Sequence, residues 1–203
     1  GYNKGILKFY CNTFGRIKRF KLSCLSEKNF NDFKAFYPHT PVRCITNGRA
    51  PICATDLYDS VKSEMSQYRY NEASRLMIHV ARCHPVKNQR LLVDALNSLV
   101  ENGYNIDLVV VGAGFDSLDG KNIISKACDR IHFIGARRNI ADYMLNADIF
   151  WLSSDFEGMP LTLLEASLAG VPAVSTPVCG AVDLIQDGVN GYLSKSHDIE
   201  DYK

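Results

Sequence analysis

The feature that most constrains the fold of this chain is a regular alternation of short apolar runs and amphipathic stretches after residue 75. Strand candidates lie at residues 76–80, 106–111, 131–134, 148–152 and 171–175. Helical patterns lie between or after them, at residues 88–102, 140–145, 160–169 and 181–186. Strands that alternate with helices are joined by crossovers, which make the strands parallel. We therefore predict an α/β fold in which a parallel sheet carries helices on both faces.

The part before residue 75 is predicted to be organised differently. Two strand candidates, residues 20–25 and 42–46, flank a helix that starts at Ser26. This helix ends near Tyr37-Pro38, because the residue before a proline avoids the helical conformation. Asn47-Gly48 signals a turn, and residues 49–74 are polar and weakly patterned, which is typical of a linker or hinge. The predicted divisions are residues 1–48, 49–74 and 75–203.

Length and charge exclude several classes of protein. The 203 residues suit one α/β domain with an additional piece. A net charge of +1 gives no electrostatic reason to expect binding to nucleic acid or to a strongly anionic membrane. The sequence contains no run of about 18 apolar residues that would predict a membrane span, and its first residues do not resemble a signal peptide. Because Gly1 is not methionine and residues 197–203 read as the first turn of another helix, we expect an excised fragment.

The cysteines predict neither a metal site nor a disulfide framework. They lie at positions 11, 24, 44, 53, 83, 128 and 179, and none are two or three residues apart. Zinc sites need closely spaced ligand pairs, and secreted disulfide frameworks favour even numbers of cysteines. We expect reduced cysteines in a cytoplasmic protein, and no bound metal.

Residues 153–170, SSDFEGMPLTLLEASLAG, predict a ligand site. Glu157 and Glu165 lie eight positions apart, in a segment that runs from a strand candidate into a helix. In an open α/β sheet, ligands bind at the carboxyl ends of strands and against helix N-termini. Glu157 is then expected in the loop at that edge and Glu165 two turns into the helix, so that one ligand meets both. Gly158 permits close approach of the backbone, and Pro160 suits the first helical position.

Arg82 and Lys87 supply positive charge at the same predicted edge. They follow the strand candidate at residues 76–80 and precede the helix at residues 88–102. A planar guanidinium and a lysine ammonium can neutralise a diphosphate and, with a helix N-terminus, stabilise charge on a departing phosphate. The plainer interpretation is that both are solvated loop cations. Their position on the same edge as Glu157 favours the diphosphate.

Other motifs in the chain predict less. Gly112-Ala-Gly114 follows a strand candidate, but position 117 is serine where a dinucleotide fingerprint needs glycine. No well-formed helix is expected directly after it, so we predict a tight turn. There is no phosphate-binding P-loop and no nucleophile elbow. Asp155 with Glu157 resembles an acidic metal-binding pair, but the adjacent glycine and proline favour a ligand-facing loop. His79 is expected to be packed or hydrogen-bonded in the core, and no histidine is assigned as a base.

Five motifs resemble family 4 of the retaining glycosyltransferases, which have the GT-B fold. Glu157 to Glu165 matches the E-x7-E signature of that family. The other matches are Val80-Ala-Arg82 with Lys87-Asn88, Val111-Gly-Ala-Gly114, Phe133-Ile-Gly135 and Asp187-Gly-Val-Asn-Gly191. Ala81 stands where the family usually has glycine, which would tighten that loop slightly. The resemblance implies that residues 75–203 form a Rossmann-like nucleotide-sugar-binding domain and residues 1–48 the tail of an acceptor-binding domain.

The resemblance also implies a role for each candidate residue. Glu165 would accept hydrogen bonds from the ribose of the nucleotide, and Glu157 would hold hydroxyls of the transferred sugar. Arg82 and Lys87 would bind the diphosphate and support the leaving group. The remaining lining residues are Gly158, Met159, Pro160 and Leu161 against sugar and phosphate, and Phe133, Gly135 and Arg137 beside the base, largely through backbone atoms. Such enzymes retain the anomeric configuration by same-face attack and require no metal, cofactor or covalent nucleophile.

The implied substrates are a UDP-, GDP- or ADP-linked sugar and a glycan or lipid-linked acceptor. The implied setting is surface-polysaccharide or glycolipid synthesis at the cytoplasmic face of the membrane, with peripheral association of the full-length enzyme. Because the acceptor site would precede Gly1, the fragment is expected to bind nucleotide without transferring sugar. Two alternatives stay open: a sugar-nucleotide 2-epimerase with a similar domain, and a catalytically inactive nucleotide-sugar-binding module. The E-x7-E spacing together with Arg82 and Lys87 favours the transferase.

Overall fold

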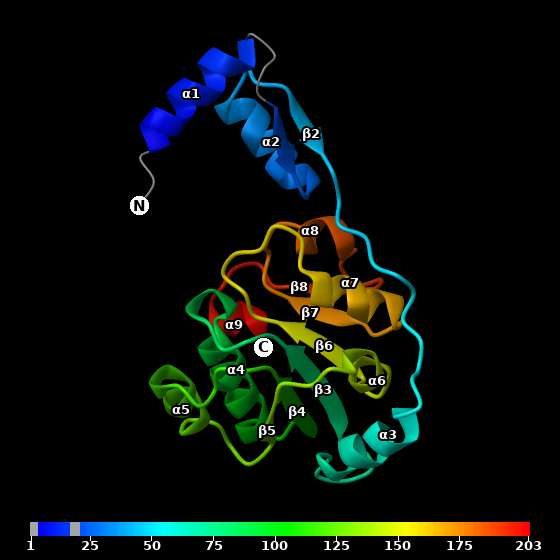
Figure 1. Cartoon of the computed structure of the whole chain (residues 1–203). Helices are drawn as coiled ribbons and strands as arrows, with labels where there is room; N and C mark the ends of the chain where they lie inside the picture. Colours follow the sequence, from blue (N-terminus) through cyan, green and yellow to red (C-terminus); the bar gives the residue numbers. More distant parts are fainter. Residues whose placement is uncertain (1–3, 17–20) are drawn as a thin grey trace.

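A computed structural model describes residues 4–16 and 21–203 and contains a six-stranded parallel sheet (Figure 1). The strands are β3 (Arg75–Val80), β4 (Ile106–Val111), β5 (Ile131–Gly135), β6 (Ile149–Leu152), β7 (Ala173–Ser175) and β8 (Gly191–Leu193). Their order is β5-β4-β3-β6-β7-β8, and every neighbouring pair is parallel. The predicted α/β fold with a parallel sheet is confirmed.

Helices cover both faces of this sheet. One face carries α3 (Tyr58–Gln67), α6 (Ile140–Leu145), α7 (Leu161–Leu168) and α8 (Ala181–Leu184), and the other carries α4 (Gln89–Glu101), α5 (Leu118–Ile124) and α9 (Ile199–Tyr202). Successive strand residues alternate between the two cores: Leu76 and Ile78 pack with the first set of helices, and Met77 packs with the second. A strand that is buried on both faces needs apolar side chains at nearly every position, which explains the continuous apolar runs.

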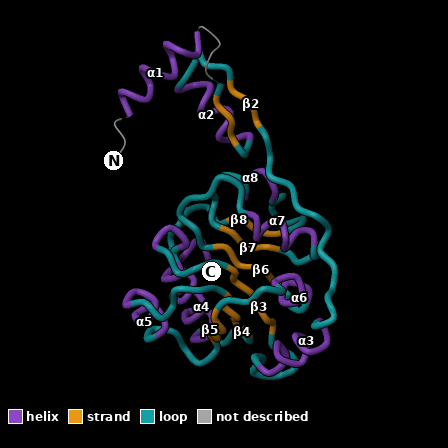
Figure 2. Tube along the Cα trace, in the orientation of Figure 1, coloured by secondary structure: helices purple, strands orange, loops and turns teal. Residues whose placement is uncertain are grey.

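The residues before the linker form a smaller unit. Strands β1 (Leu22–Cys24) and β2 (Val42–Cys44) pair in parallel, with α2 (Glu27–Phe36) between them in sequence and α1 (Lys4–Arg16) ahead of them. The start predicted for α2 is confirmed, because Ser26 Oγ accepts a hydrogen bond from the Asn29 amide at 3.2 Å. Helix α1 is an element that the sequence pattern does not predict, and residue 20 of the predicted first strand lies outside the described residues. Figure 2 shows an extended loop that runs from β2 past α7 and α6 to α3.

The segment expected to be a linker, residues 49–74, contains a helix. Within α3, Val61 and Met65 are only 5% and 1% exposed and pack in the core on one face of the large sheet. Two apolar residues four positions apart in a polar stretch form too weak a stripe to stand out in the sequence. None of the described helices is both long and apolar enough to cross a membrane.

Two expectations about helix starts are corrected by the structure. A helix does follow Gly114: α5 begins at residue 118, and Ser117 Oγ caps it by accepting a hydrogen bond from the Gly120 amide at 3.1 Å. Pro160 is the N-cap of α7 rather than its first helical residue. Because α7 begins at Leu161, Glu165 lies about one turn into the helix, not two.

Candidate functional site

The strand order places a crevice at the carboxyl ends of β3 and β6. From β3 the chain continues outward to β4 and β5, whereas from β6 it continues to β7 and β8 on the other side. In open α/β sheets, ligands bind where the direction of the crossovers changes in this way. The segment that leaves β3 carries Arg82 and Lys87, and the segment that leaves β6 carries Glu157. The sheet thus brings to one edge the charged residues that the sequence predicted there.

Lys87 and Glu157 form the central contact of this edge. The Lys87 ammonium donates to Glu157 Oε1 at 2.5 Å, and the Ser154 hydroxyl donates to the same oxygen at 2.8 Å. Their side chains are 24% and 13% exposed. A charged group that is mostly buried needs a partner of opposite charge, and here Lys87 and Glu157 compensate each other. Within the described ranges, Glu157 Oε2 has no such donor, so it remains an acceptor for a bound molecule.

The two loops that carry this pair are fastened together. Ser153 Oγ donates to the Lys87 carbonyl at 2.8 Å, and Asn88 Nδ2 donates to Asp155 Oδ1 at 2.8 Å. Asn88 has a left-handed backbone with φ of 46°, and its side chain also accepts from the Leu91 amide at the start of α4. Asparagine tolerates this conformation better than most residues. The loops after β3 and β6 therefore form one preorganised surface.

Arg82 presents its guanidinium to solvent. Its carbonyl accepts a hydrogen bond at 2.9 Å from Gln89, which is 2% exposed, so the backbone of the residue is held in place. Among the described residues none forms an ion pair with Arg82. A positioned backbone with an uncompensated cation can receive an anion without first breaking an internal contact.

His79, in β3, contacts Gln89, the residue that holds the Arg82 backbone. Its Nδ1 lies 2.8 Å from the Trp151 carbonyl oxygen and its ring is fully buried. Burial lowers the pKa of His79 to about 4, so the ring is neutral at pH 7. Because a carbonyl only accepts, Nδ1 carries the proton, and Nε2 is left to accept from Gln89 Nε2 at 3.5 Å. The prediction of a packed, hydrogen-bonded core histidine is confirmed.

Glu165 has a partner that the sequence did not indicate. The residue is 7% exposed, and its carboxylate accepts a hydrogen bond at 2.8 Å from Nε of Arg49, a residue of the predicted linker. The same segment supplies a contact from Asn47 Nδ2 to the Met159 carbonyl at 3.4 Å. Nothing in the pattern around Arg49 distinguishes it from other polar linker residues, because the contact spans 116 positions of sequence.

The residues between the two glutamates shape the start of α7. Met159 is 7% exposed, whereas the side chain of Leu161 is 43% exposed. A Cβ on Gly158 would lie 3.2 Å from Leu25 Cδ1, so a larger residue would push against the smaller unit. No side chain caps α7, and Pro160 has no N–H group. The first amides of this helix are thus free to face an anion at the edge of the sheet.

The residues predicted to border a base lie at the end of β5. Phe133 packs against Phe115 with ring centroids 5.0 Å apart, and the Gly135 carbonyl accepts from the Gly112 amide at 3.0 Å. Gly135 has φ of 74°, a conformation that favours glycine. The Phe133 ring thus contributes to packing and Gly135 to the turn, and the expectation that this turn contacts a base through its backbone stays a prediction.

Arg137 is held by a network of its own. Its Nε donates to the Tyr143 hydroxyl at 2.9 Å, and its Nη2 donates to Glu64 Oε1 at 3.3 Å. Burial alone would raise the pKa of Glu64, but hydrogen bonds from Tyr143, Tyr68 and Arg137 outweigh it and lower that pKa. The Arg137 guanidinium therefore links α3 to α6, and its charge is already compensated within the protein.

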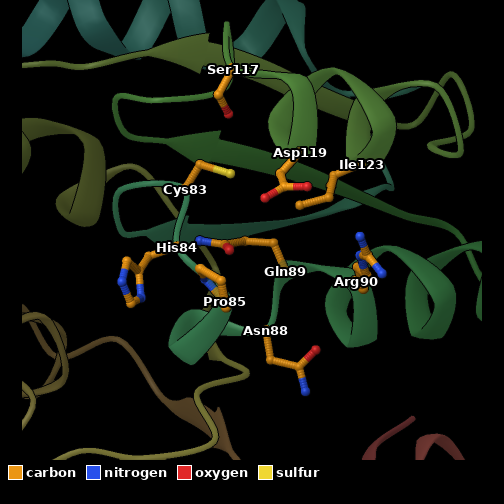
Figure 3. A pocket seen from close by; sticks show the side chains of 9 residues that line it. All are labelled: Cys83, His84, Pro85, Asn88, Gln89, Arg90, Ser117, Asp119 and Ile123. Atoms are coloured by element: carbon orange, nitrogen blue, oxygen red, sulfur yellow. The ribbon is translucent and has the colours of Figure 1, made fainter.

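A cavity of about 310 Å³ lies between the loop after β3 and the start of α5 (Figure 3), and it shares Asn88 and Gln89 with the loop described above. It is lined by Cys83, His84, Pro85, Asn88, Gln89, Arg90, Ser117, Asp119 and Ile123. Because α4 and α5 pack on the face of the sheet opposite α7, this cavity does not include Glu157 or Glu165. No cluster of three or more His, Cys, Asp or Glu side chains that could hold a metal ion occurs within residues 4–16 and 21–203.

Comparison with known proteins decides the family. The model of the family "Glycosyl transferases group 1" matches residues 60–203. The chain belongs to this family. The match begins inside α3 and covers the six-stranded sheet, the loops with Arg82, Lys87 and Glu157, and the helix with Glu165. The resemblance to GT-B glycosyltransferases that the motifs indicated is therefore confirmed at the level of family and fold.

Relatives and solved structures agree with this assignment. The chain is 31% identical over 143 residues to N-acetyl-alpha-D-glucosaminyl L-malate synthase of Bacillus anthracis, covering 68% of this chain and 37% of that protein. It is 28% identical over 186 residues to the lipopolysaccharide glucosyltransferase WaaG of Escherichia coli K12, covering 86% and 48%. The Anabaena HepE structure in complex with UDP and glucose superposes with a TM-score of 0.75 at 22% identity, covering 98% and 56%. The chain thus spans about half or less of the relatives it matches.

Proposed function

We propose that the protein to which this chain belongs is a retaining glycosyltransferase. It transfers a sugar from a nucleoside-diphosphate sugar to a glycan or lipid-linked acceptor. The observation that carries the proposal is the contact between Lys87 and Glu157 at the crevice between β3 and β6, with Glu165 on the following helix. A cation, two carboxylates and a helix N-terminus at one edge suit a ligand that carries both phosphate and hydroxyl groups.

The positive groups of the site bind and stabilise the diphosphate. Arg82 offers an uncompensated guanidinium and Lys87 an ammonium shared with Glu157, while the free amides of α7 add the positive end of a helix dipole. When the bond to the sugar breaks, negative charge grows on the departing phosphate, and these groups stabilise it. On this proposal the chain needs no metal ion. Nucleotide binding is therefore expected to be unchanged in about 5 mM EDTA, an excess of chelator over any bound metal ion.

The two carboxylates divide the rest of the donor between them. Glu157 Oε2 accepts a hydrogen bond from a hydroxyl of the transferred sugar, and Glu165 accepts from a ribose hydroxyl of the nucleotide. Each charged hydrogen bond of this kind contributes on the order of 1.5–3 kcal/mol. Glu157 lies beside Lys87, so it holds the sugar next to the cation that meets the phosphate. The backbone of residues 158–161 and the turn at residues 133–137 complete the donor site.

The names of the relatives support the substrate class. WaaG is a lipopolysaccharide glucosyltransferase, and HepE was crystallised with UDP and glucose. UDP is therefore the first nucleotide to test, ahead of GDP and ADP, and a lipid-linked glycan is the first acceptor. A protein that acts on such acceptors would work at the cytoplasmic face of a membrane, to which it would attach peripherally.

Titration calorimetry of this chain with UDP, GDP and ADP tests the donor site without an acceptor. We expect heat with at least one nucleotide and an affinity at least tenfold weaker after Glu165→Ala, which is about 1.4 kcal/mol. Asp201→Ala, which removes a carboxylate from α9, is the matched control. No heat with any of the three nucleotides would refute the assignment.

Product analysis of the whole protein separates the remaining alternatives. Incubation with a panel of nucleotide sugars and glycan acceptors yields a glycoside of retained anomeric configuration if the proposal holds. A change of configuration at the sugar C2 without an acceptor would indicate a 2-epimerase. Tight binding without any product would indicate an inactive nucleotide-sugar-binding module.

A further inference from the structure

Arg49 places a second positive charge against the carboxylates of the site. It lies in the extended segment between β2 and α3, and both Nε and Nη2 of its guanidinium donate to Glu165 Oε1. The Arg49 side chain is 48% exposed and that of Glu165 is 9% exposed. The contact therefore joins a surface residue of the linker to a buried residue of α7.

The geometry of this contact leaves one carboxylate oxygen unused. An arginine that binds a carboxylate with two N–H groups commonly occupies both oxygens. Here both N–H groups converge on Oε1, and within the described part of the chain no donor reaches Glu165 Oε2. A buried carboxylate needs compensation for its charge and a fixed orientation to act as a specific acceptor. Arg49 supplies both and keeps Oε2 available.

The segment that carries Arg49 is itself placed by contacts with the loop before α7 and, through the smaller unit, with α8. Asn47 Nδ2 donates to the Met159 carbonyl at 3.4 Å, just before α7. Further back, the Glu27 amide at the start of α2 donates to Asp183 Oδ2 in α8 at 2.8 Å. These contacts lie on both sides of β2 in the sequence. The position of Arg49 therefore depends on how the smaller unit sits against α7 and α8.

We propose that Arg49 is a positioning residue for nucleotide recognition: it holds Glu165 so that Oε2 accepts a hydrogen bond from the ribose. The inference rests on the proposed function, since it assumes a nucleotide ligand. If Arg49 has this role, recognition of the ribose depends on the segment between β2 and α3, and the donor site is incomplete without that segment. The opposite role is an Arg49 that occupies Glu165 in competition with the nucleotide.

Calorimetry with two probes distinguishes these roles. The probes are UDP and 2′,3′-dideoxyuridine diphosphate, which lacks the ribose hydroxyls that Glu165 would bind. For Arg49→Ala we expect the Kd of UDP to rise about tenfold, by the loss of an oriented charged hydrogen bond, and the Kd of the dideoxy analogue to change less than about twofold. Arg49→Lys should recover part of the UDP affinity, because an ammonium can still pair with Oε1.

A double-mutant cycle tests whether Arg49 acts through Glu165. If it does, Arg49→Ala combined with Glu165→Gln weakens UDP binding no more than Glu165→Gln alone. Arg43→Ala, which removes an exposed guanidinium from β2, is the matched control and should leave both Kd values unchanged. Because Arg49 is half exposed, its replacement should not unfold the chain, which circular dichroism verifies.

The outcomes separate this inference from the proposed function. If the unaltered chain binds none of UDP, GDP and ADP, the proposed function fails and the role of Arg49 fails with it. If the unaltered chain binds UDP but Arg49→Ala binds it equally well, only the role of Arg49 is overturned. Tighter binding by Arg49→Ala, or an equal loss with the dideoxy analogue, would likewise overturn it.

Discussion

Replacing Lys87 by methionine measures how strongly the crevice depends on its central ion pair. The variant keeps most of the aliphatic stem and removes the ammonium that donates to Glu157 at 2.5 Å. Glu157 would keep only the hydrogen bond from Ser154 while its side chain stays 13% exposed. The result is a carboxylate that is mostly buried and has lost the cation that compensates it.

The expected magnitude follows from burial. Two unit charges about 4 Å apart attract by about 4 kcal/mol at an effective dielectric constant of about 20. Breaking a fully buried pair costs about 3–5 kcal/mol, but Lys87 is 24% exposed, so water offsets part of that loss. We expect Lys87→Met to lower the free energy of unfolding by about 2 kcal/mol and Glu157→Gln by about 1 kcal/mol.

Urea unfolding of the two single variants and the double variant gives the coupling free energy. We expect a coupling of about 1–2 kcal/mol, because the double variant leaves no unpaired charge. Lys62→Met, on the exposed side of α3, is the matched control and should change stability by less than about 0.5 kcal/mol. A coupling below about 0.3 kcal/mol would refute the reasoning, since the two side chains would then be independent.

Three further predictions concern the surroundings of the site. Burial lowers the pKa of His79 to about 4, whereas a histidine in the unfolded chain has a pKa near 6.5. The contribution of neutral His79 to the free energy of unfolding is therefore fully present above about pH 6.5 and is lost toward pH 4, by at most on the order of 3 kcal/mol. The pH dependence of the urea unfolding midpoint over this range should be weaker in His79→Gln. Arg137→Ala should lower the free energy of unfolding by about 1–2 kcal/mol yet change UDP affinity less than about twofold, and a larger loss of affinity would contradict the structural role of the guanidinium. Gly112→Ala should destabilise by about 3 kcal/mol or more, because the new Cβ overlaps the Ala81 carbonyl, whereas Gly48→Ala meets nothing within 4 Å and should be tolerated in the same thermal-melting assay.

The success of the fold prediction has a local cause. Strands buried on both faces require continuous apolar runs, and the apolar stripe from Leu91 to Val100 marks one face of a helix, so both signals lie in neighbouring residues. The same reasoning failed at α3, where Val61 and Met65 alone mark the buried side. The polar remainder of that helix is stabilised by contacts such as Glu64 with Tyr143, which are distant in sequence.

The sequence predicted where the candidate residues lie, but not which side chains pair with them. That Arg82, Lys87 and Glu157 lie at one edge follows from parallel strands, whose carboxyl ends meet there. That Arg137 is occupied by Glu64 does not follow, because the two are 73 positions apart. The contact of Phe133 with Phe115, in contrast, joins two strand ends that the alternation of strands and helices already places side by side.

The sequence by itself determined the parallel sheet and the edge of that sheet at which Arg82, Lys87 and Glu157 gather. Periodicity and the order of strands and helices encode these features locally. Only the tertiary structure decided which charges pair: Lys87 with Glu157 across 70 positions, and Arg49 with Glu165 across 116. Pairing depends on distances of a few ångströms between segments that packing brings together, and no local pattern in the chain records those distances.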